Sequence, residues 1–224
     1  MMNTQFRNVL ILVEGQTEEA FVKDVLNPHL NSLNIHLIPT LVVTKRTASR
    51  RFKGGVVSYA QVENDLRQLC KDTSATAITT MIDFARLDGK GFPGWDELKT
   101  RFANRPIYDK VAHLERRLRE TIDDSRFRPY FSLHEYEALL FSRPDKIAAW
   151  FPQLSPKAVE QLSAVRAAVE SPELINDLNP PSYRIQEILR QQPENYEKRF
   201  MGFTSLWTLG CPPCALNVGT LMNG

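Results

Sequence analysis

The stretch Asn8–Thr17, NVLILVEGQT, decides the fold of this chain. Residues 9–13 are all apolar and show no polar alternation, which predicts a strand buried on both faces of a parallel sheet. Glu14 and Gly15 follow where that strand ends, and open α/β sheets carry their chemistry at the carboxyl ends of the strands. Thr17, followed by two acids, predicts a helix N-cap with an acidic first turn.

The composition is that of an ordinary globular protein and excludes several classes. The 224 residues fit one large α/β domain, or a domain with a smaller helical appendage. The formal net charge of +2 indicates no class of partner, so only local charge is informative. Three cysteines do not suggest a disulfide scaffold. The N-terminal apolar run is too short for a signal peptide or a membrane span, so we expect a cytoplasmic protein with no membrane partner.

Strand and helix patterns alternate along the chain. Runs rich in β-branched and aromatic residues predict further strands at 35–43, 76–82 and 127–133. Apolar residues at helical spacing, the first run capped by Ser58, predict helices at 58–71, 108–122, 155–169 and 183–191. Pro39 lies inside the second strand, where a proline indicates an edge position or a bulge.

This order predicts an α/β fold with a mainly parallel central sheet, helices on both faces, and a helical C-terminal region. We expect the α/β domain to span residues 1–142 and a helical extension packed on it to span residues 143–224. The loop from Phe84 to Gly94 holds several glycines, which predicts a flexible or closely approached segment.

Acids follow three of the predicted strands. Glu14 ends the first, Asp83 ends the third, and the last runs into Glu135 and Glu137. Because parallel strands bring their carboxyl ends to one edge, these acids can meet although they are far apart in sequence. Carboxylate oxygens are the ligands that Mg²⁺ and Mn²⁺ favour. Taken singly, each acid is equally well explained as a helix cap or a solvated loop residue.

A basic loop between the second strand and the next helix is the candidate for binding phosphate. It holds five cations and no acid between residues 44 and 55. They are Lys45, Arg46, Arg50, Arg51 and Lys53. Such a loop would add a salt-dependent electrostatic contribution to nucleic-acid binding that does not distinguish DNA from RNA. The alternative is a solvated loop without a ligand.

Other patterns receive a structural interpretation. Cys211 and Cys214 have C-x-x-C spacing, but zinc needs two further ligands and no second pair follows, so we interpret the spacing as due to chance or to structural cysteines. The arginines at 116, 117 and 119 are interpreted as a solvated helix surface, and the tryptophans as packing residues.

Three motifs occur in a fixed order: VEGQTE at 13–18, MIDFARLDGKGFPG at 81–94 and HEYEALLFS at 134–142. Together they resemble the hallmarks of a toprim-like family of unknown function, number 4276 among such domains. The first also resembles the opening motif of the toprim fold, the metal-binding domain of topoisomerases, primases and several nucleases.

The resemblance implies a toprim-like sheet and a metal-dependent site. In that fold the glutamate at the position of Glu14 is a metal ligand or general acid–base, and the aspartate at Asp83 is a metal ligand. By the same analogy Glu135 or Glu137 completes the site, and His134 orients a phosphate or a metal ligand. The catalytic set implied is Glu14, Asp83, Glu135 and His134, with Mg²⁺ or Mn²⁺ held by Glu14, Asp83, Glu135 and Glu137.

One departure from the toprim pattern divides the functional hypotheses. Toprim domains have Asp-x-Asp after the third strand, and here Ala85 occupies the second position, so Asp88 in the following loop would have to substitute. The first hypothesis is a nuclease acting on DNA or RNA, which by resemblance works with a separate ATPase in bacterial anti-phage defence. The alternative, favoured by Ala85, is a non-catalytic module that binds an ATPase partner or nucleic acid. A small-molecule phosphotransferase is less favoured because no nucleotide-binding loop is visible.

Overall fold

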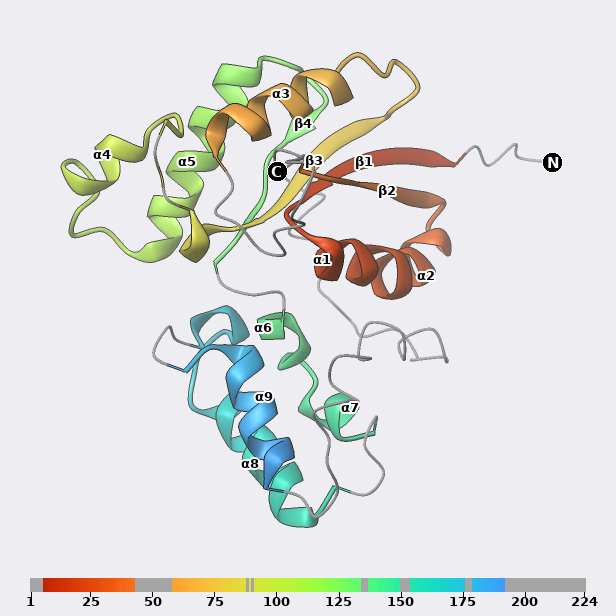
Figure 1. Cartoon of the computed structure of the whole chain (residues 1–224), viewed down its shortest axis with the longest axis vertical. Coiled ribbons are helices and arrows are strands. Elements are labelled where there is room, and N and C mark those ends of the chain that lie inside the picture. Colours follow the sequence, from red (N-terminus) through yellow and green to blue (C-terminus); the bar gives the residue numbers. More distant parts are fainter. Residues whose placement is uncertain are drawn as a thin grey trace, which may run out of the picture. The chain divides into compact units, whose positions relative to one another are not determined.

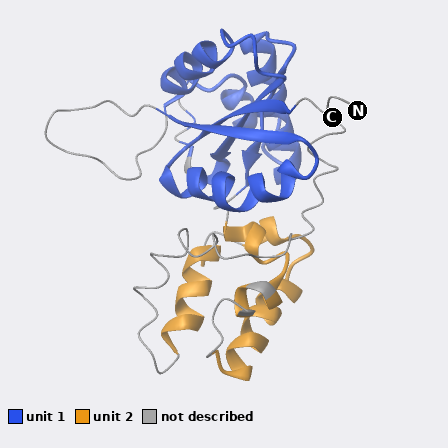
Figure 2. Ribbon diagram, turned by 90° about the vertical axis from the view of Figure 1, so that its right-hand side faces the viewer, with its two compact units in different colours: residues 1–133 blue, residues 134–224 orange. Residues whose placement is uncertain are grey.

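The computed structural model describes residues 6–42, 58–87, 89, 91–133, 137–149, 154–175 and 179–191. The chain divides into two compact units, residues 1–133 and 134–224 (Figure 2). In the described ranges the first unit is α/β and the second is helical. No helix in these ranges is long and apolar enough to cross a membrane.

A parallel sheet forms the centre of the first unit (Figure 1). Its strands lie in the order β2 (Ile35–Leu41), β1 (Arg7–Val13), β3 (Ala77–Asp83) and β4 (Phe127–Arg128), and β5 (Phe131–Ser132) also pairs with β3. Every pairing is parallel, so the carboxyl ends share one edge. β1 lies between β2 and β3, and its residues 10–13 are at most 5% exposed. The predicted doubly buried strand is therefore confirmed.

The edge strand β2 is closed off by a side chain. Asn27 is buried, and its Nδ2 donates to the Leu37 carbonyl at 2.9 Å while the Leu37 N–H donates to Asn27 Oδ1 at 2.7 Å. These bonds occupy backbone groups that an unprotected edge would offer to another chain. Pro39, two residues further on, has no N–H to leave unpaired on that side. Of the two predictions for Pro39, the edge position is confirmed.

Helical segments cover both faces of the sheet (Figure 1). One face is covered by a continuous run of α1 (Gln16–Phe21), the π-helical η1 (Val22–Leu26) and α2 (Asn27–Asn31). The other is covered by α3 (Tyr59–Leu69) and α5 (Ile107–Ile122), with the short α4 (Trp95–Lys99) preceding α5. The predicted α/β fold with a parallel sheet is confirmed.

The first helix begins earlier than predicted. Gly15 is the N-cap, so the prediction of Thr17 at that position is wrong, although the acidic first turn of Glu18 and Glu19 is confirmed. An extended backbone at Gly15 lets the chain turn directly from β1 into the helix. Further along, the widened π turn precedes Pro28, whose ring would clash with a carbonyl four residues back in a regular α-helix.

The predicted strand at 127–133 forms two pieces, β4 and β5, interrupted at Pro129 and Tyr130. Pro129 has no N–H to donate to a neighbouring strand. The hydroxyl of the fully buried Thr80 on β3 donates to the Tyr130 carbonyl at 2.7 Å and accepts from the Tyr130 N–H at 2.9 Å. The two pieces pair with β3 in the same register on either side of the gap, so this hydroxyl replaces the missing ladder bonds.

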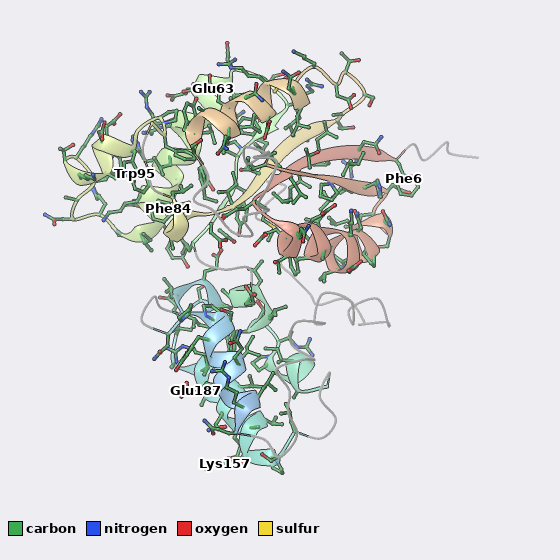
Figure 3. The ribbon with its side chains drawn as sticks, in the orientation of Figure 1. Phe6, Glu63, Phe84, Trp95, Lys157 and Glu187 are labelled. Carbon is green, nitrogen blue, oxygen red and sulfur yellow. The ribbon has the colours of Figure 1, made fainter. Side chains whose placement is uncertain are left out.

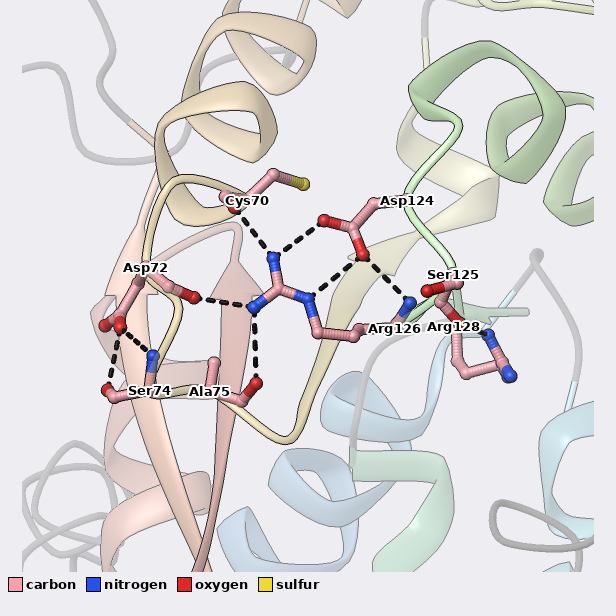
Figure 4. A network of polar contacts seen from close by, with 8 residues as sticks. All are labelled: Cys70, Asp72, Ser74, Ala75, Asp124, Ser125, Arg126 and Arg128. Carbon is pink, nitrogen blue, oxygen red and sulfur yellow. Dashed lines mark hydrogen bonds and ion pairs between the residues drawn. The ribbon is translucent and has the colours of Figure 1, made fainter.

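At the amino edge of the sheet, Arg126 joins the loop before β3 to the turn before β4 (Figure 4). Its guanidinium donates to the carbonyls of Cys70, Asp72 and Ala75 at 2.7, 2.6 and 3.3 Å. It also forms a bidentate pair with Asp124 at 2.8 and 3.1 Å. The hydrogen bonds from Arg126 lower the pKa of Asp124 to about 2. This cluster fixes the starts of β3 and β4.

The second unit is built from short helices. They are α6 (Glu137–Leu140), α7 (Pro144–Ala149), α8 (Pro156–Ala167), the 3-10 turn η3 (Pro172–Leu174) and α9 (Pro181–Arg190). Ser155 caps α8, accepting from the Ala158 N–H at 3.3 Å. Leu162, Ile175 and Ile185 are fully buried in this unit. The predicted helical C-terminal region is confirmed as far as residue 191.

Thr80→Val is expected to destabilise the protein by about 1 to 3 kcal/mol, because it keeps the shape of the side chain but removes the hydrogen bonds of the fully buried hydroxyl to the half-buried N–H and carbonyl of Tyr130. Thr79→Val, on the neighbouring half-buried position, is the matched control and is expected to change stability by about 0.5 kcal/mol or less. Urea unfolding of both variants measures the difference. Equal losses would show that the Thr80 hydroxyl does not replace ladder bonds.

Asp124 is expected to make stability depend on acid pH. Its folded pKa lies below the unfolded value of 3.8, so its contribution is complete well above pH 3.8 and is lost as the pH falls toward 2. Between pH 6 and pH 3 the stability advantage of the wild type over Asp124→Asn should shrink by up to about 1 kcal/mol, because solvent screens part of the ion pair. Urea unfolding at the two pH values measures it, and a constant advantage would contradict the lowered pKa.

Candidate functional site

The first two predicted acids lie next to each other at the carboxyl edge of the sheet. Val13 pairs with Met81, so Glu14 follows the paired end of β1 while Asp83 closes β3. The Asp83 N–H donates to Glu14 Oε2 at 3.4 Å. Asp83 is only 3% exposed, whereas Glu14 is half-buried. The parallel pairing of β1 and β3 therefore brings together two acidic residues that are far apart in sequence, with the Asp83 main chain in contact with the Glu14 carboxylate.

The third acidic motif follows in the chain directly after the strand beside Asp83. Ser132 on β5 pairs with Asp83 and is nearly fully buried. Glu137 lies in the first turn of α6, in the second unit, and is half-buried. His134 and Glu135 lie outside the described residues. The convergence of this motif with Glu14 and Asp83 stays a prediction.

The loop after Asp83 begins with a 3-10 turn, η2 (Phe84–Arg86). Ala85, which stands where toprim domains have a second aspartate, is exposed in this turn. Its N–H donates to the Leu133 carbonyl at 3.3 Å, which ties the turn to the end of the last strand. Asp88, the possible substitute, lies outside the described residues.

The rest of this loop is packed against aromatic rings. Gly89 has a φ of +70°, and a Cβ there would lie 1.6 Å from Cε2 of Trp95. The Trp95 ring also contacts Phe84 at 5.9 Å between centroids, and the two lie close together in Figure 3. Buried Phe92 contacts Tyr59 at 5.4 Å. The prediction of a closely approached segment is thus confirmed at Gly89, and the interpretation of Trp95 as a packing residue is also confirmed.

Glu18 is an acid at this edge that the sequence alone did not single out. A Cβ on Gly15 would lie 3.0 Å from Glu18 Oε2, so this carboxylate folds back over the turn that follows Glu14. With Gly15 as the N-cap, Glu18 occupies the N3 position, whose carboxylates commonly reach back to the start of a helix. Placing the N-cap at Gly15 in the sequence would have indicated this position for Glu18.

Residues 13–213 match the family model described as Domain of unknown function (DUF4276). The chain belongs to this family. The match begins at the end of β1, spans both units, and includes all three sequence motifs. No curated protein and no solved structure matches the chain at a significant level.

The donor set at the edge suits a hard divalent cation. Glu14 and Asp83 offer carboxylate oxygens, and Mg²⁺ is commonly held by one or two carboxylates while water and substrate phosphates supply its other ligands. Within the described ranges no group of three or more His, Cys, Asp or Glu side chains is arranged to hold a metal.

Several predicted functional residues lie outside the described residues. They include the five cations of the basic loop, Lys45, Arg46, Arg50, Arg51 and Lys53, as well as Cys211 and Cys214. Their roles stay predictions. The described part of the candidate site is the Glu14–Asp83 pair with the packed loop that follows it.

Gly89→Ala is expected to destabilise the protein by more than about 2 kcal/mol, because the added methyl group combines a strained positive φ with a clash against Trp95. Gly91→Ala is the matched control. Its φ is also positive, at +82°, but the nearest atom to its Cβ is 3.7 Å away, on Tyr59. The control should cost only the backbone strain, about 1 kcal/mol.

Urea unfolding of both glycine variants measures the difference. In a background where Trp150 and Trp207 are replaced by phenylalanine, the fluorescence of Trp95 should change in the Gly89 variant alone. Equal effects of the two substitutions would contradict the packing of Gly89 on the indole.

Proposed function

We propose that this protein is a divalent-metal-dependent nuclease of the toprim type, which hydrolyses phosphodiester bonds in DNA or RNA. The observation that carries the proposal is the contact between the Glu14 carboxylate and the Asp83 main chain at adjacent strand ends. Two carboxylates at the carboxyl edge of a parallel sheet are the arrangement that the three motifs imply. The packed loop after Asp83 supports it further, because a fixed loop holds a ligand in place.

Each residue has a role in the proposed reaction. The Asp83 N–H orients the Glu14 carboxylate, which holds the ion or takes the proton of the attacking water. Asp83 holds the ion from the neighbouring strand. When bound, a Mg²⁺ or Mn²⁺ ion lowers the pKa of a water molecule and neutralises charge on the phosphoryl group. From sequence, Glu135 or Glu137 completes the ligand set and His134 orients a phosphate.

Substrate and partner follow from the sequence in the same proposal. The five cations of the basic loop, residues 45–53, position the phosphate backbone. The sequence has no Walker A motif, so ATP hydrolysis would come from a separate ATPase. We place the protein with such an ATPase in bacterial anti-phage defence, on the strength of the motif resemblance.

A second candidate function is a non-catalytic toprim-like module. The observation that favours it is Ala85, which is exposed where a second aspartate is expected. Within the described ranges no three-ligand group compensates for the missing acid. Such a module would bind an ATPase partner or nucleic acid without cleaving it.

Cleavage of labelled DNA and RNA with millimolar Mn²⁺ or Mg²⁺ tests the nuclease. We expect the wild type to cleave, and Glu14→Gln and Asp83→Asn each to lower the rate by about 100-fold or more, because both carboxylates act in the transition state. Glu120→Gln is the matched control, since Glu120 is an exposed acid paired with Arg117 on α5. It should cleave at the wild-type rate.

Mn²⁺ binding, measured by calorimetry on the same variants, separates the two candidate functions. Binding by the wild type and its loss in Glu14→Gln support the metal site. Equal cleavage by the wild type and Glu14→Gln would exclude the assigned residues. No cleavage together with no Mn²⁺ binding would favour the module.

A further inference from the structure

The turn between α4 and α5 carries basic residues that no role above uses. We call residues 99–105 the basic turn. It holds Lys99, Arg101 and Arg105, all exposed, and no acid. None of these three cations forms an ion pair with any residue in the part of the chain that the structure describes. The Arg101 guanidinium lies over the Phe102 ring, 6.0 Å from its centroid, a contact that leaves its charge uncompensated by any acid in the described ranges.

The backbone of the basic turn is held in place. The ring of Phe102 stacks on the buried His113 of α5, with 4.2 Å between centroids and 30° between planes. The Phe102 N–H donates to the Glu97 carbonyl at 3.0 Å, and the Arg105 N–H donates to the Phe102 carbonyl at 3.0 Å. Because the turn is already ordered, binding a ligand costs less conformational entropy than it would on a loose loop.

The acids around the basic turn leave it positive. The Glu97 carboxylate lies 3.6 Å from the Arg117 guanidinium, which offsets its charge. Asp96 and Asp109 flank the turn in α4 and in the first turn of α5. Lys110 adds a fourth cation beside the turn, and its Nζ donates a hydrogen bond to the Ala103 carbonyl at 3.1 Å.

The basic turn lies toward the same edge of the sheet as Glu14 and Asp83. The chain leaves the carboxyl end of β3, passes through α4 and returns along α5 to the parallel strand β4 (Figure 1). A helix in such a crossover runs opposite to the strands, so it begins at their carboxyl edge. The 16 residues of α5 span about 24 Å and the 7 of β3 about 23 Å, so the helix is long enough to reach from the start of β4 back toward that edge.

We propose that the basic turn binds the sugar-phosphate backbone of single-stranded nucleic acid. Lys99, Arg101 and Arg105 pair with successive phosphates, as in charged grooves that follow a strand. Tyr108, 43% exposed at the start of α5, offers a ring on which an unpaired base can stack. That ring favours a single strand over a duplex, whose bases are already stacked. Identifying the bound strand as the substrate rests on the proposed nuclease function, whereas the binding itself does not.

Fluorescence anisotropy with a fluorescein-labelled single-stranded oligonucleotide tests the proposal. It is run in EDTA over a series of NaCl concentrations, with DNA and RNA probes. The test variant replaces Lys99, Arg101 and Arg105 with glutamine. The control makes the same charge change at exposed cations elsewhere in the first unit, Lys23, Arg67 and Lys71.

We expect the basic-turn variant to bind at least tenfold more weakly than the control. The slope of log K against log salt should fall by about 2, since each lost phosphate contact on a single strand contributes about 0.7. Tyr108→Ala should weaken single-strand binding by about fivefold or more and leave duplex binding unchanged. Circular dichroism checks that every variant is folded.

Three results would overturn the proposal. The first is equal affinity and equal salt slope in the basic-turn and control variants. The second is tighter binding of a duplex than of a single strand by the wild type. The third is equally tight binding of poly-glutamate with the same dependence on the variant, which would indicate an acidic protein partner.

The outcome is separate from that of the nuclease assay. A wild type that binds in EDTA through the basic turn but never cleaves would refute the nuclease function alone. If the wild type cleaves through Glu14 and the basic-turn variant binds nucleic acid as well as the control, only the proposed binding by the basic turn is refuted.

Discussion

The parallel pairing of β1 with β3 is the constraint on which the candidate site depends. It joins two strands that are far apart in sequence and ends them side by side, so that the Asp83 N–H reaches the Glu14 carboxylate. The apolar run of β1 makes this pairing central, because a strand without a polar face is stable only when it is covered on both sides. The two acids need not attract each other, because the pairing of the buried strands already places them side by side.

Polar side chains stabilise the sheet at its amino edge and in the middle of β3. At the amino edge, Arg126 satisfies three carbonyls of the loop before β3 and pairs with Asp124 before β4, which fixes the starts of both strands. In the middle of β3, the buried Thr80 hydroxyl maintains the register with β4 and β5 across the gap at Tyr130. The scaffold is therefore held by contacts away from Glu14 and Asp83. This arrangement leaves the carboxyl edge to polar groups that a ligand can use.

Local signals predicted much of this fold, and long-range contacts account for what they missed. The buried run of β1 and the edge position of Pro39 follow from side-chain periodicity and the missing proline N–H. The adjacency of Glu14 and Asp83 follows from parallel pairing. The Asn27 clamp on β2 and the approach of Gly89 to Trp95 join segments whose meeting no local pattern encodes. The N-cap was misplaced because threonine is a strong local signal, whereas Gly15 caps through its backbone alone.

Charge on the carboxyl edge connects the two proposals. Two carboxylates repel a polyanion, so nucleic acid approaching Glu14 and Asp83 meets an electrostatic cost unless cations offset it. In the proposed function a divalent ion offsets the charge at the acids, while the basic turn attracts the strand away from them. If both act on one strand, the ion and the nucleic acid favour each other's binding, and thermodynamic linkage makes that coupling equal in both directions. An edge that holds acids at the strand ends and cations on the following crossover therefore suits a metal-dependent reaction on nucleic acid better than either feature alone.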